Sequence, residues 1–140
     1  MIVVDTSALM AVVLGEPDAA ACMDVLERET GVIISAVTLA EALIVAGRRG
    51  VASEMTQLVE GLAMEVAAVT ASTARGVAEA YGRWGKGIHH AALNFGDCYA
   101  YVEARQRACP LLYVGNDFAQ TDIVAARQAK IGAKRPRSRK

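Results

Sequence analysis

The chain is organised around the stretch Asn94-Phe95-Gly96-Asp97-Cys98-Tyr99-Ala100-Tyr101, which places one carboxylate, Asp97, where a helix is predicted to begin. Three further acids stand beside other predicted elements. Asp5 ends the apolar run at 2–4, Glu41 lies in the early turns of a predicted helix, and Asp117 follows the late apolar run at 111–114. The positions of these four acids decide both the fold and the chemistry that the sequence predicts.

Short apolar runs alternate with helical patterns along the whole chain. Such alternation predicts parallel strands, right-handed crossovers and helices on both faces of a sheet. We therefore expect an α/β fold, a three-layer α/β/α sandwich with a central, mainly parallel sheet of four to five strands. The expected strands are 2–4, 32–34, 65–69, 111–114 and, more weakly, 123–124; the expected helices are 8–14, 18–30, 35–49, 52–62, 70 or 72–84 and 94–108, with one further turn at 118–120.

The four acids are predicted to share one edge of this sheet. Ligands of such folds bind beyond the carboxyl ends of the strands. Each acid also has a structural explanation: Asp5 can cap a helix, Thr38 to Glu41 matches a capping box, Asp97 suits a helix dipole, and Asp117 can close an Asx turn. Together, however, four carboxylates repel one another and need raised pKa values or a cation. Oxygen ligands without a Cys or His cluster favour Mg²⁺ or Mn²⁺, which assists phosphodiester hydrolysis.

Composition indicates one domain that needs no disulfide framework. The 140 residues are 54% hydrophobic, and the three cysteines lack metal-ligand spacing. No apolar run reaches the ~18 residues of a membrane span, and no basic segment precedes the first apolar run, so we expect a cytoplasmic protein with no membrane association. Residues 134–140 hold 5 of the 15 basic side chains, leaving 10 basic against 15 acidic before them. We expect a nuclease domain at 1–133 and a basic, disordered tail at 134–140.

These residues resemble the PIN-domain ribonucleases, specifically the VapC-type toxins of bacterial toxin–antitoxin pairs. The resemblance covers nearly the whole chain: the start 2–9, the helix with Glu41, the run from 81 to 87 leading to 93–98, and the segment 110–118 with 121–123. It implies that Asp5, Glu41, Asp97 and Asp117 form a catalytic metal site with Ser7 as an auxiliary hydroxyl. It also implies cleavage of structured RNA such as tRNA, a homodimer, and a VapB-like antitoxin that inserts a basic side chain.

One departure from the family pattern leaves the fourth ligand open. Asn116 stands where some members carry an acid, so either Asp117 or Asp122 completes the metal shell; we favour Asp117 and expect Asp122 in a turn. The loop histidines His89 and His90 are more simply solvated than catalytic. Trp84 is expected to pack at a helix end.

Two other function classes fit parts of the pattern. A phosphoacceptor signalling module also arranges acids around Mg²⁺, but the lysine expected after its last strand is missing from 111–116. A non-catalytic RNA-binding domain is the other alternative, and metal-dependent cleavage distinguishes it from a nuclease.

Overall fold

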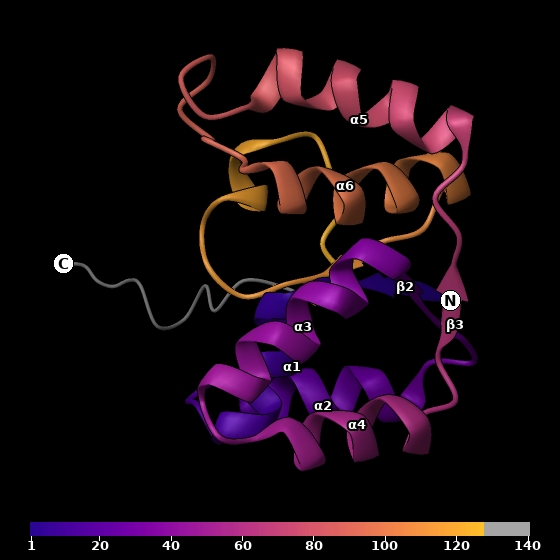
Figure 1. The fold of residues 1–140 in the computed structure, drawn as a ribbon, viewed down its shortest axis with the longest axis vertical. Helices are drawn as coiled ribbons and strands as arrows, with labels where there is room; N and C mark the ends of the chain where they lie inside the picture. The colour runs from indigo at the N-terminus through magenta and orange to yellow at the C-terminus, as the bar shows by residue number, and fades with distance from the viewer. Residues whose placement is uncertain (128–140) are drawn as a thin grey trace, which may run out of the picture.

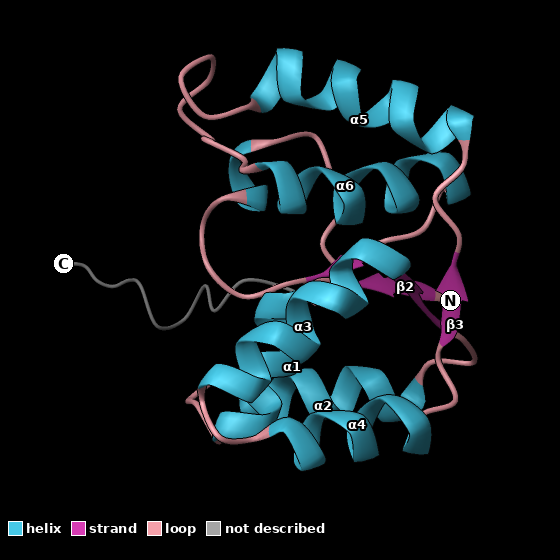
Figure 2. Ribbon diagram, in the orientation of Figure 1, coloured by secondary structure: helices cyan, strands magenta, loops and turns pink. Residues whose placement is uncertain are grey.

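A four-stranded parallel sheet lies between two groups of helices in the computed structural model, which describes residues 1–127 (Figures 1 and 2). The predicted tail at 134–140 and the domain boundary at 133 lie outside the described residues. The strand order is β3-β2-β1-β4 and each pairing is parallel. The α/β class is thus confirmed. The strands are β1 (Ile2–Val4), β2 (Val32–Ser35), β3 (Glu65–Ala67) and β4 (Leu111–Leu112).

Helices cover both faces of the sheet, as Figure 1 shows. On one face α6 packs on the strands and α5 packs on α6; α1, α2 and α4 lie on the other face. The helix α3 contacts α6 as well as α1 and α4, so it joins the two layers. The bounds are α1 (Thr6–Leu14), α2 (Ala19–Arg28), α3 (Ala36–Arg48), α4 (Ala52–Gly61), α5 (Ala71–Trp84) and α6 (Phe95–Arg107), followed by the 3₁₀ turn η1 (Phe118–Gln120).

Strand alternation divides the core into two apolar clusters. In β1, Val3 faces the cluster under α5 and α6, while Ile2 and Val4 face the cluster on the other side. Leu111 and Leu112 of β4 divide in the same way. Successive side chains of a strand point to opposite faces, so a strand buried on both faces is a continuous apolar run. The apolar runs of the sequence therefore identified the central strands.

Two strands are shorter than the sequence predicted, and one is absent. The fourth strand ends at Leu112 because the Val114 N–H donates to the Ser7 hydroxyl, 3.0 Å away, instead of continuing the ladder. The third ends at Ala67, shortly before Thr70 caps α5. A fifth strand at 123–124 was predicted wrongly. Within residues 1–127 that segment forms only an isolated bridge, between Leu111 and Ala125.

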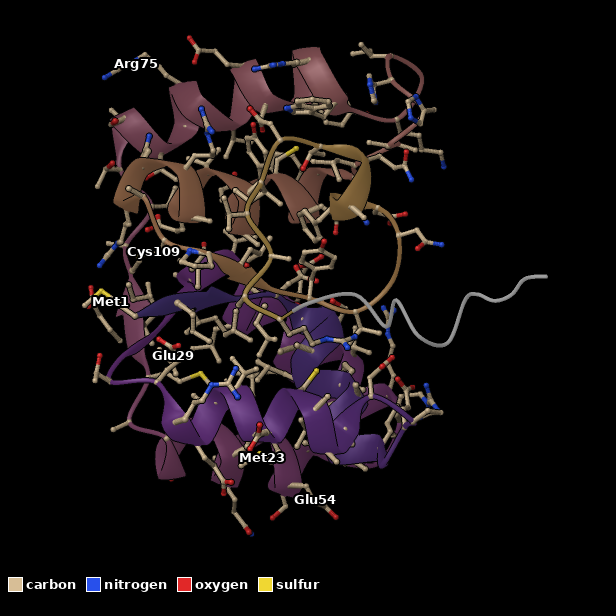
Figure 3. The ribbon with its side chains drawn as sticks, turned by 180° about the vertical axis from the view of Figure 1, so that it is seen from behind. Met1, Met23, Glu29, Glu54, Arg75 and Cys109 are labelled. Carbon is tan, nitrogen blue, oxygen red and sulfur yellow. The ribbon has the colours of Figure 1, made fainter. Side chains whose placement is uncertain are left out.

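The two edges of the sheet differ in character. Met1, Glu29 and Cys109 lie near one another in Figure 3 and mark the amino-terminal edge, where the Met1 amino group pairs with Glu29 at 2.6 Å. At the carboxyl ends of the strands, β1 has β2 and β3 on one side and β4 on the other, so the order of the strands reverses at β1. Ligands bind at such a reversal of strand order.

Among the helices of residues 1–127, none has both the length and the apolar character to cross a bilayer.

Candidate active site

Asp5 is a buried carboxylate at the carboxyl end of the central strand β1. Its residue is only 4% exposed, and its backbone N–H continues the pairing with β4 by donating to the Leu112 carbonyl at 3.0 Å. Burial raises the pKa of Asp5, and the charge of Asp117 raises it further, while hydrogen bonds from Ser7 and the Thr6 backbone oppose the shift. The predicted capping role of Asp5 is also real, since it is the N-cap of α1.

Ser7 holds the Asp5 carboxylate in place. Its backbone N–H and its hydroxyl both donate to Asp5 Oδ2, at 3.0 Å and 2.7 Å. The same hydroxyl accepts from the Val114 N–H. The Ser7 side chain therefore ties the end of β1 to the segment that follows β4 and leads to Asp117. In this arrangement Ser7 holds the Asp5 carboxylate in one orientation, which gives a definite form to the auxiliary role predicted for its hydroxyl.

Glu41 reaches the site from the second turn of α3. The helix is capped by Ser35, whose hydroxyl accepts from the Val37 N–H at 3.2 Å, so Thr38 lies inside the helix. The capping box predicted between Thr38 and Glu41 is therefore wrong. Burial raises the pKa of Glu41, the charge of Asp5 adds to the shift, and the Thr6 side chain opposes it.

Gly96 provides the place that the Glu41 carboxylate occupies. A side-chain carbon built at Gly96 would collide with the carboxylate atoms of Glu41. Glu41 on α3 therefore approaches the first turn of α6 as closely as the backbone allows. Gly96 was not among the site residues predicted from the sequence, because its role depends on how closely α3 and α6 approach each other.

Asp97 lies in the first turn of α6 and is half of a capping box. Its carboxylate accepts from the Asn94 N–H at 3.0 Å, and the Asn94 side chain accepts from the Asp97 N–H at 2.7 Å. Burial raises the pKa of Asp97 to about 6; the charges of Asp5, Asp117 and Glu41 all contribute, and the Asn94 hydrogen bond opposes them. Asp97 is thus the acid whose pKa is raised by the charge of each of the other three.

Asp117 is the exposed member of the group. It precedes η1, and within residues 1–127 its side chain makes no capping hydrogen bond to that turn. The Asx-type role that competed with a functional one is therefore not observed. Its charge acts on both Asp5 and Asp97. The structure brings the four predicted acids into one electrostatically coupled group, which we call the acidic site: Asp5, Glu41, Asp97 and Asp117.

The acidic site suits a hard divalent cation by its donor chemistry. All four side chains offer carboxylate oxygens, the ligands that Mg²⁺ and Mn²⁺ prefer. A buried hydroxyl, Thr38 Oγ1, has no hydrogen-bond partner within the described chain and lies one turn before Glu41 on α3. As placed, no three His, Cys, Asp or Glu side chains of residues 1–127 are close enough to form a coordination group.

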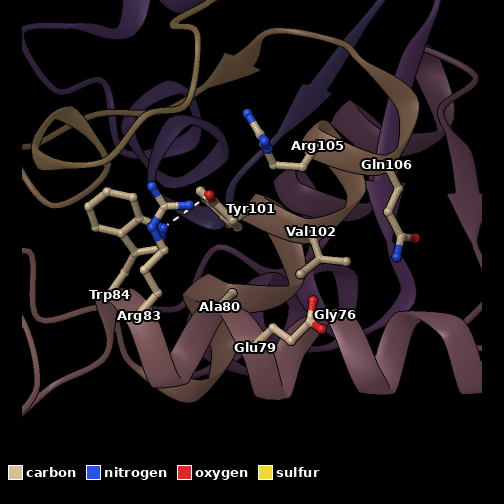
Figure 4. Close-up of a pocket in the computed structure, with 9 residues that line it drawn as sticks. All are labelled: Gly76, Glu79, Ala80, Arg83, Trp84, Tyr101, Val102, Arg105 and Gln106. Atoms are coloured by element: carbon tan, nitrogen blue, oxygen red, sulfur yellow. Dashed lines mark hydrogen bonds between the residues drawn. The ribbon is translucent and has the colours of Figure 1, made fainter.

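Asp122, the alternative late acid, is engaged elsewhere. It accepts from the Tyr101 hydroxyl at 2.6 Å, and it lies 3.8 Å from Arg83 and 3.5 Å from Arg105. The Trp84 indole N–H donates to the same Tyr101 oxygen at 3.0 Å; Figure 4 shows this bond beside the pocket between α5 and α6. The Asp122 carboxylate thus fastens the segment after η1 to α6.

The loop histidines also have structural partners. His89 Nδ1 accepts from the Ala91 N–H at 2.9 Å, and its ring meets Trp84 edge-on with centroids 4.8 Å apart. His90 stacks on His89 and hydrogen-bonds to Gln120 at 2.9 Å. These contacts order the loop between α5 and α6, and Trp84 is buried as expected.

Comparison with known proteins gives consistent matches over most of the chain. A family model described as PIN domain matches residues 2–124. Ribonuclease VapC36 of Mycobacterium tuberculosis is 43% identical over 125 residues, covering 86% of this chain and 90% of the relative. Ribonuclease VapC42 of the same species is 40% identical over 126 residues, covering 86% and 95%.

Solved structures with low sequence identity share the fold. The crystal structure of Mycobacterium tuberculosis VapC20, described as a sarcin–ricin loop cleaving toxin, superposes with a TM-score of 0.75 at 20% identity, covering 91% of this chain and all of that one. A toxin–antitoxin complex from Klebsiella pneumoniae gives a TM-score of 0.69 at 15% identity, covering 92% and 100%. At these identities the likeness concerns architecture alone.

Proposed function

The chain belongs to the PIN-domain family, and from that premise we propose that it is a metal-dependent endoribonuclease of the VapC toxin type. The observation that carries the proposal is the gathering of Asp5 at the end of β1, Glu41 against Gly96 and Asp97 in the first turn of α6, with Asp117 acting on Asp5 and Asp97 by its charge. A cation stabilises the ionised forms of such neighbouring carboxylates. The names of the relatives, ribonucleases, supply the reaction class.

We assign the acidic site to Mg²⁺ or Mn²⁺. When bound, such an ion supplies a Lewis acid that neutralises charge on a phosphodiester and makes water more acidic. Asp5 contributes a carboxylate that Ser7 holds in one orientation. Glu41 and Asp97 contribute carboxylates from two helices that meet at Gly96, and the exposed Asp117 faces solvent, from which the RNA arrives. Asp122 is left outside the set because Tyr101 and two arginines already engage it.

RNA cleavage with purified protein tests the assignment. We expect fragments from structured RNA such as tRNA in the presence of Mg²⁺ or Mn²⁺, and none after a chelator is added. Asp5→Asn and Asp97→Asn should each lower the rate by at least about 100-fold, the scale on which removing a preorganised electrostatic contribution acts. Asp24→Asn, at an exposed acid paired with Arg28 on α2, is the matched control and should cleave normally. Undiminished cleavage by the two site variants would remove the proposed site, and tight RNA binding without cleavage would indicate a non-catalytic module.

The biological setting that we propose follows the family. The protein would act in the cytoplasm as a homodimer, neutralised by a VapB-like antitoxin. A basic antitoxin side chain is complementary to four gathered carboxylates, because an opposite charge within a few ångströms stabilises their ionised forms. Growth arrest on expression, relieved by co-expression of a VapB-like antitoxin, tests this part. Normal growth with intact cellular RNA would count against a toxin.

A further inference from the structure

Phe95 is an exposed aromatic side chain at the rim of the acidic site. It is the first residue of α6 and is 63% exposed, although burial of a phenylalanine normally stabilises a fold. Gly96, which follows it, receives the Glu41 carboxylate, and Asp97 is the next residue. The ring therefore belongs to the residue directly before the one against which the Glu41 carboxylate rests, in the same first turn of α6 as Asp97.

The neighbouring residues have identifiable roles within the fold, and the Phe95 ring does not. Asn94 and Asp97 form the capping box, and Gly96 admits Glu41. Polar residues and proline serve the start of a helix better than phenylalanine does. These roles leave most of the Phe95 side chain exposed to solvent.

The Phe95 ring also packs against the ring of Tyr99. Tyr99, one turn later and buried, meets it edge-on, with ring centroids 5.1 Å apart and planes at 80°. Residues four apart share one side of a helix, so this contact is built into α6. An edge-to-face neighbour fixes the plane of a ring while leaving a ring face open to solvent. The geometry is that of a preorganised stacking surface.

We propose that Phe95 stacks on an unpaired nucleobase next to the phosphate held at the acidic site, so that the enzyme selects looped or single-stranded RNA; the inference rests on the proposed nuclease function. The occupant follows from charge and shape together. A purely apolar protein surface on Phe95 would desolvate the Glu41 carboxylate that rests against the next residue, Gly96, whereas a nucleotide joins a flat π-face to a phosphate that a cation can link to carboxylates. A base inside a duplex cannot offer that face.

Binding measurements test the proposal independently of cleavage. A labelled single-stranded RNA decamer and the same decamer in a duplex would be titrated with full-length protein carrying Asp97→Asn, which prevents hydrolysis. Adding Phe95→Ala should weaken binding of the single strand by roughly ten-fold or more, the usual size of one aromatic–base stack, and leave the duplex unchanged. Phe95→Trp should keep the affinity within about three-fold, whereas Phe95→Leu, apolar but without a π-face, should behave like alanine.

A matched control and a modified substrate sharpen the test. Val124→Ala removes an equally exposed apolar side chain, 65% exposed, beside the other end of α6, and should change nothing. In the cleaving protein, an abasic nucleotide beside the mapped cleavage site should lower kcat/KM about as much as Phe95→Ala does, and the two changes together should cost no more than either alone.

Three results would overturn the stacking role. They are equal single-strand affinity with and without Phe95, an equal loss for single strand and duplex, and a smaller assembly mass for Phe95→Ala or Phe95→Leu, which would place the ring between copies of the chain. Failure of the nuclease assignment looks different. In that case the wild-type protein would cleave no RNA with Mg²⁺ or Mn²⁺, yet Phe95 would still govern its binding of the unpaired strand.

Discussion

Replacing Asp97 with asparagine should make the protein more stable while abolishing RNA cleavage. The folded state raises the pKa of Asp97 to about 6 from a normal value of 3.8, through burial and the charges of the other three acids. Its ionised form is therefore destabilised by folding. An asparagine at 97 is neutral, and its side-chain oxygen can still accept from the Asn94 N–H, so the capping box survives.

The expected gain can be worked from this shift. Each pKa unit corresponds to 1.36 kcal/mol, so a shift of about two units sets an upper limit near 3 kcal/mol. Asp97 is only partly buried, and solvent screening reduces the figure to about 1–2 kcal/mol. In a chain of this size that raises Tm by roughly 3–7 °C.

The gain should depend on pH in one direction. Because folding raises the pKa, the protonated carboxyl stabilises the native state fully below the normal value of 3.8, and this contribution is lost as pH rises through about 6. Asp97→Asn should therefore stabilise most at about pH 7.5, roughly half as much at about pH 5, and very little near pH 4.

Thermal unfolding with a chelator present measures the effect. The same scans with Mg²⁺ or Mn²⁺ should raise Tm of the wild-type protein more than that of Asp97→Asn, because a ligand stabilises the state that binds it. Asp24→Asn is the control: its side chain is 75% exposed and it should shift stability by less than about 0.5 kcal/mol. Two results would contradict this prediction. One is a folded Asp97→Asn protein that melts at or below the wild-type temperature at about pH 7.5 without metal; the other is a gain in stability over wild type that is the same at about pH 7.5 and about pH 4.

Further predictions concern the residues that place the acids. Gly96→Ala should displace the Glu41 carboxylate, lowering metal affinity and kcat by about 10-fold or more while the circular dichroism spectrum is kept, because the added carbon collides with it. Ser7→Ala removes two hydrogen bonds around Asp5 and should lower Tm by a few degrees together with activity; unchanged values for both would contradict the role assigned to Ser7. Tyr101→Phe removes the hydrogen bond to Asp122 and the one from the buried Trp84 indole, and should cost about 1–3 kcal/mol in denaturant unfolding, with cleavage chemistry unchanged at saturating RNA. At limiting Mn²⁺, cleavage should fall as pH decreases through about 6, and excess Mn²⁺ should restore it, since protons compete with the ion for Asp97.

The sequence predicted the elements of the fold well because burial imposes its pattern directly on composition. The runs at 2–4, 32–34 and 111–114 are apolar since both faces of those strands are covered, and each contains a strand of the structure, the last one only at Leu111–Leu112. The residues at which the strands end were less predictable. The last central strand stops at Leu112 because of a hydrogen bond from Val114 to Ser7, 107 positions away, and such a partner is invisible to local patterns.

The sequence indicated that the four acids would approach one another, but it did not indicate the contacts that hold them. Asp5, Glu41, Asp97 and Asp117 could be picked out because parallel topology sends strand ends and helix starts to one edge. That Glu41 rests against Gly96, or that Ser7 bridges Asp5 and Val114, depends on the crossing of α3 with α6 and on the β1–β4 register. Those are tertiary relations, and a single sequence carries no direct signal for them.

The hydrogen bonds of the acidic site do not themselves require carboxylates. Asp5 accepts from the Ser7 N–H and hydroxyl, and Asp97 accepts from the Asn94 N–H; an amide oxygen would accept the same bonds. Amides would also avoid the desolvation and repulsion that raise the pKa of Asp5 and of Asp97. By the criterion of folding alone, the charged side chains are therefore the less stable choice. Negative charge at this edge of the sheet fits the proposed function, in which these carboxylates would hold a divalent cation that neutralises charge on an RNA phosphodiester.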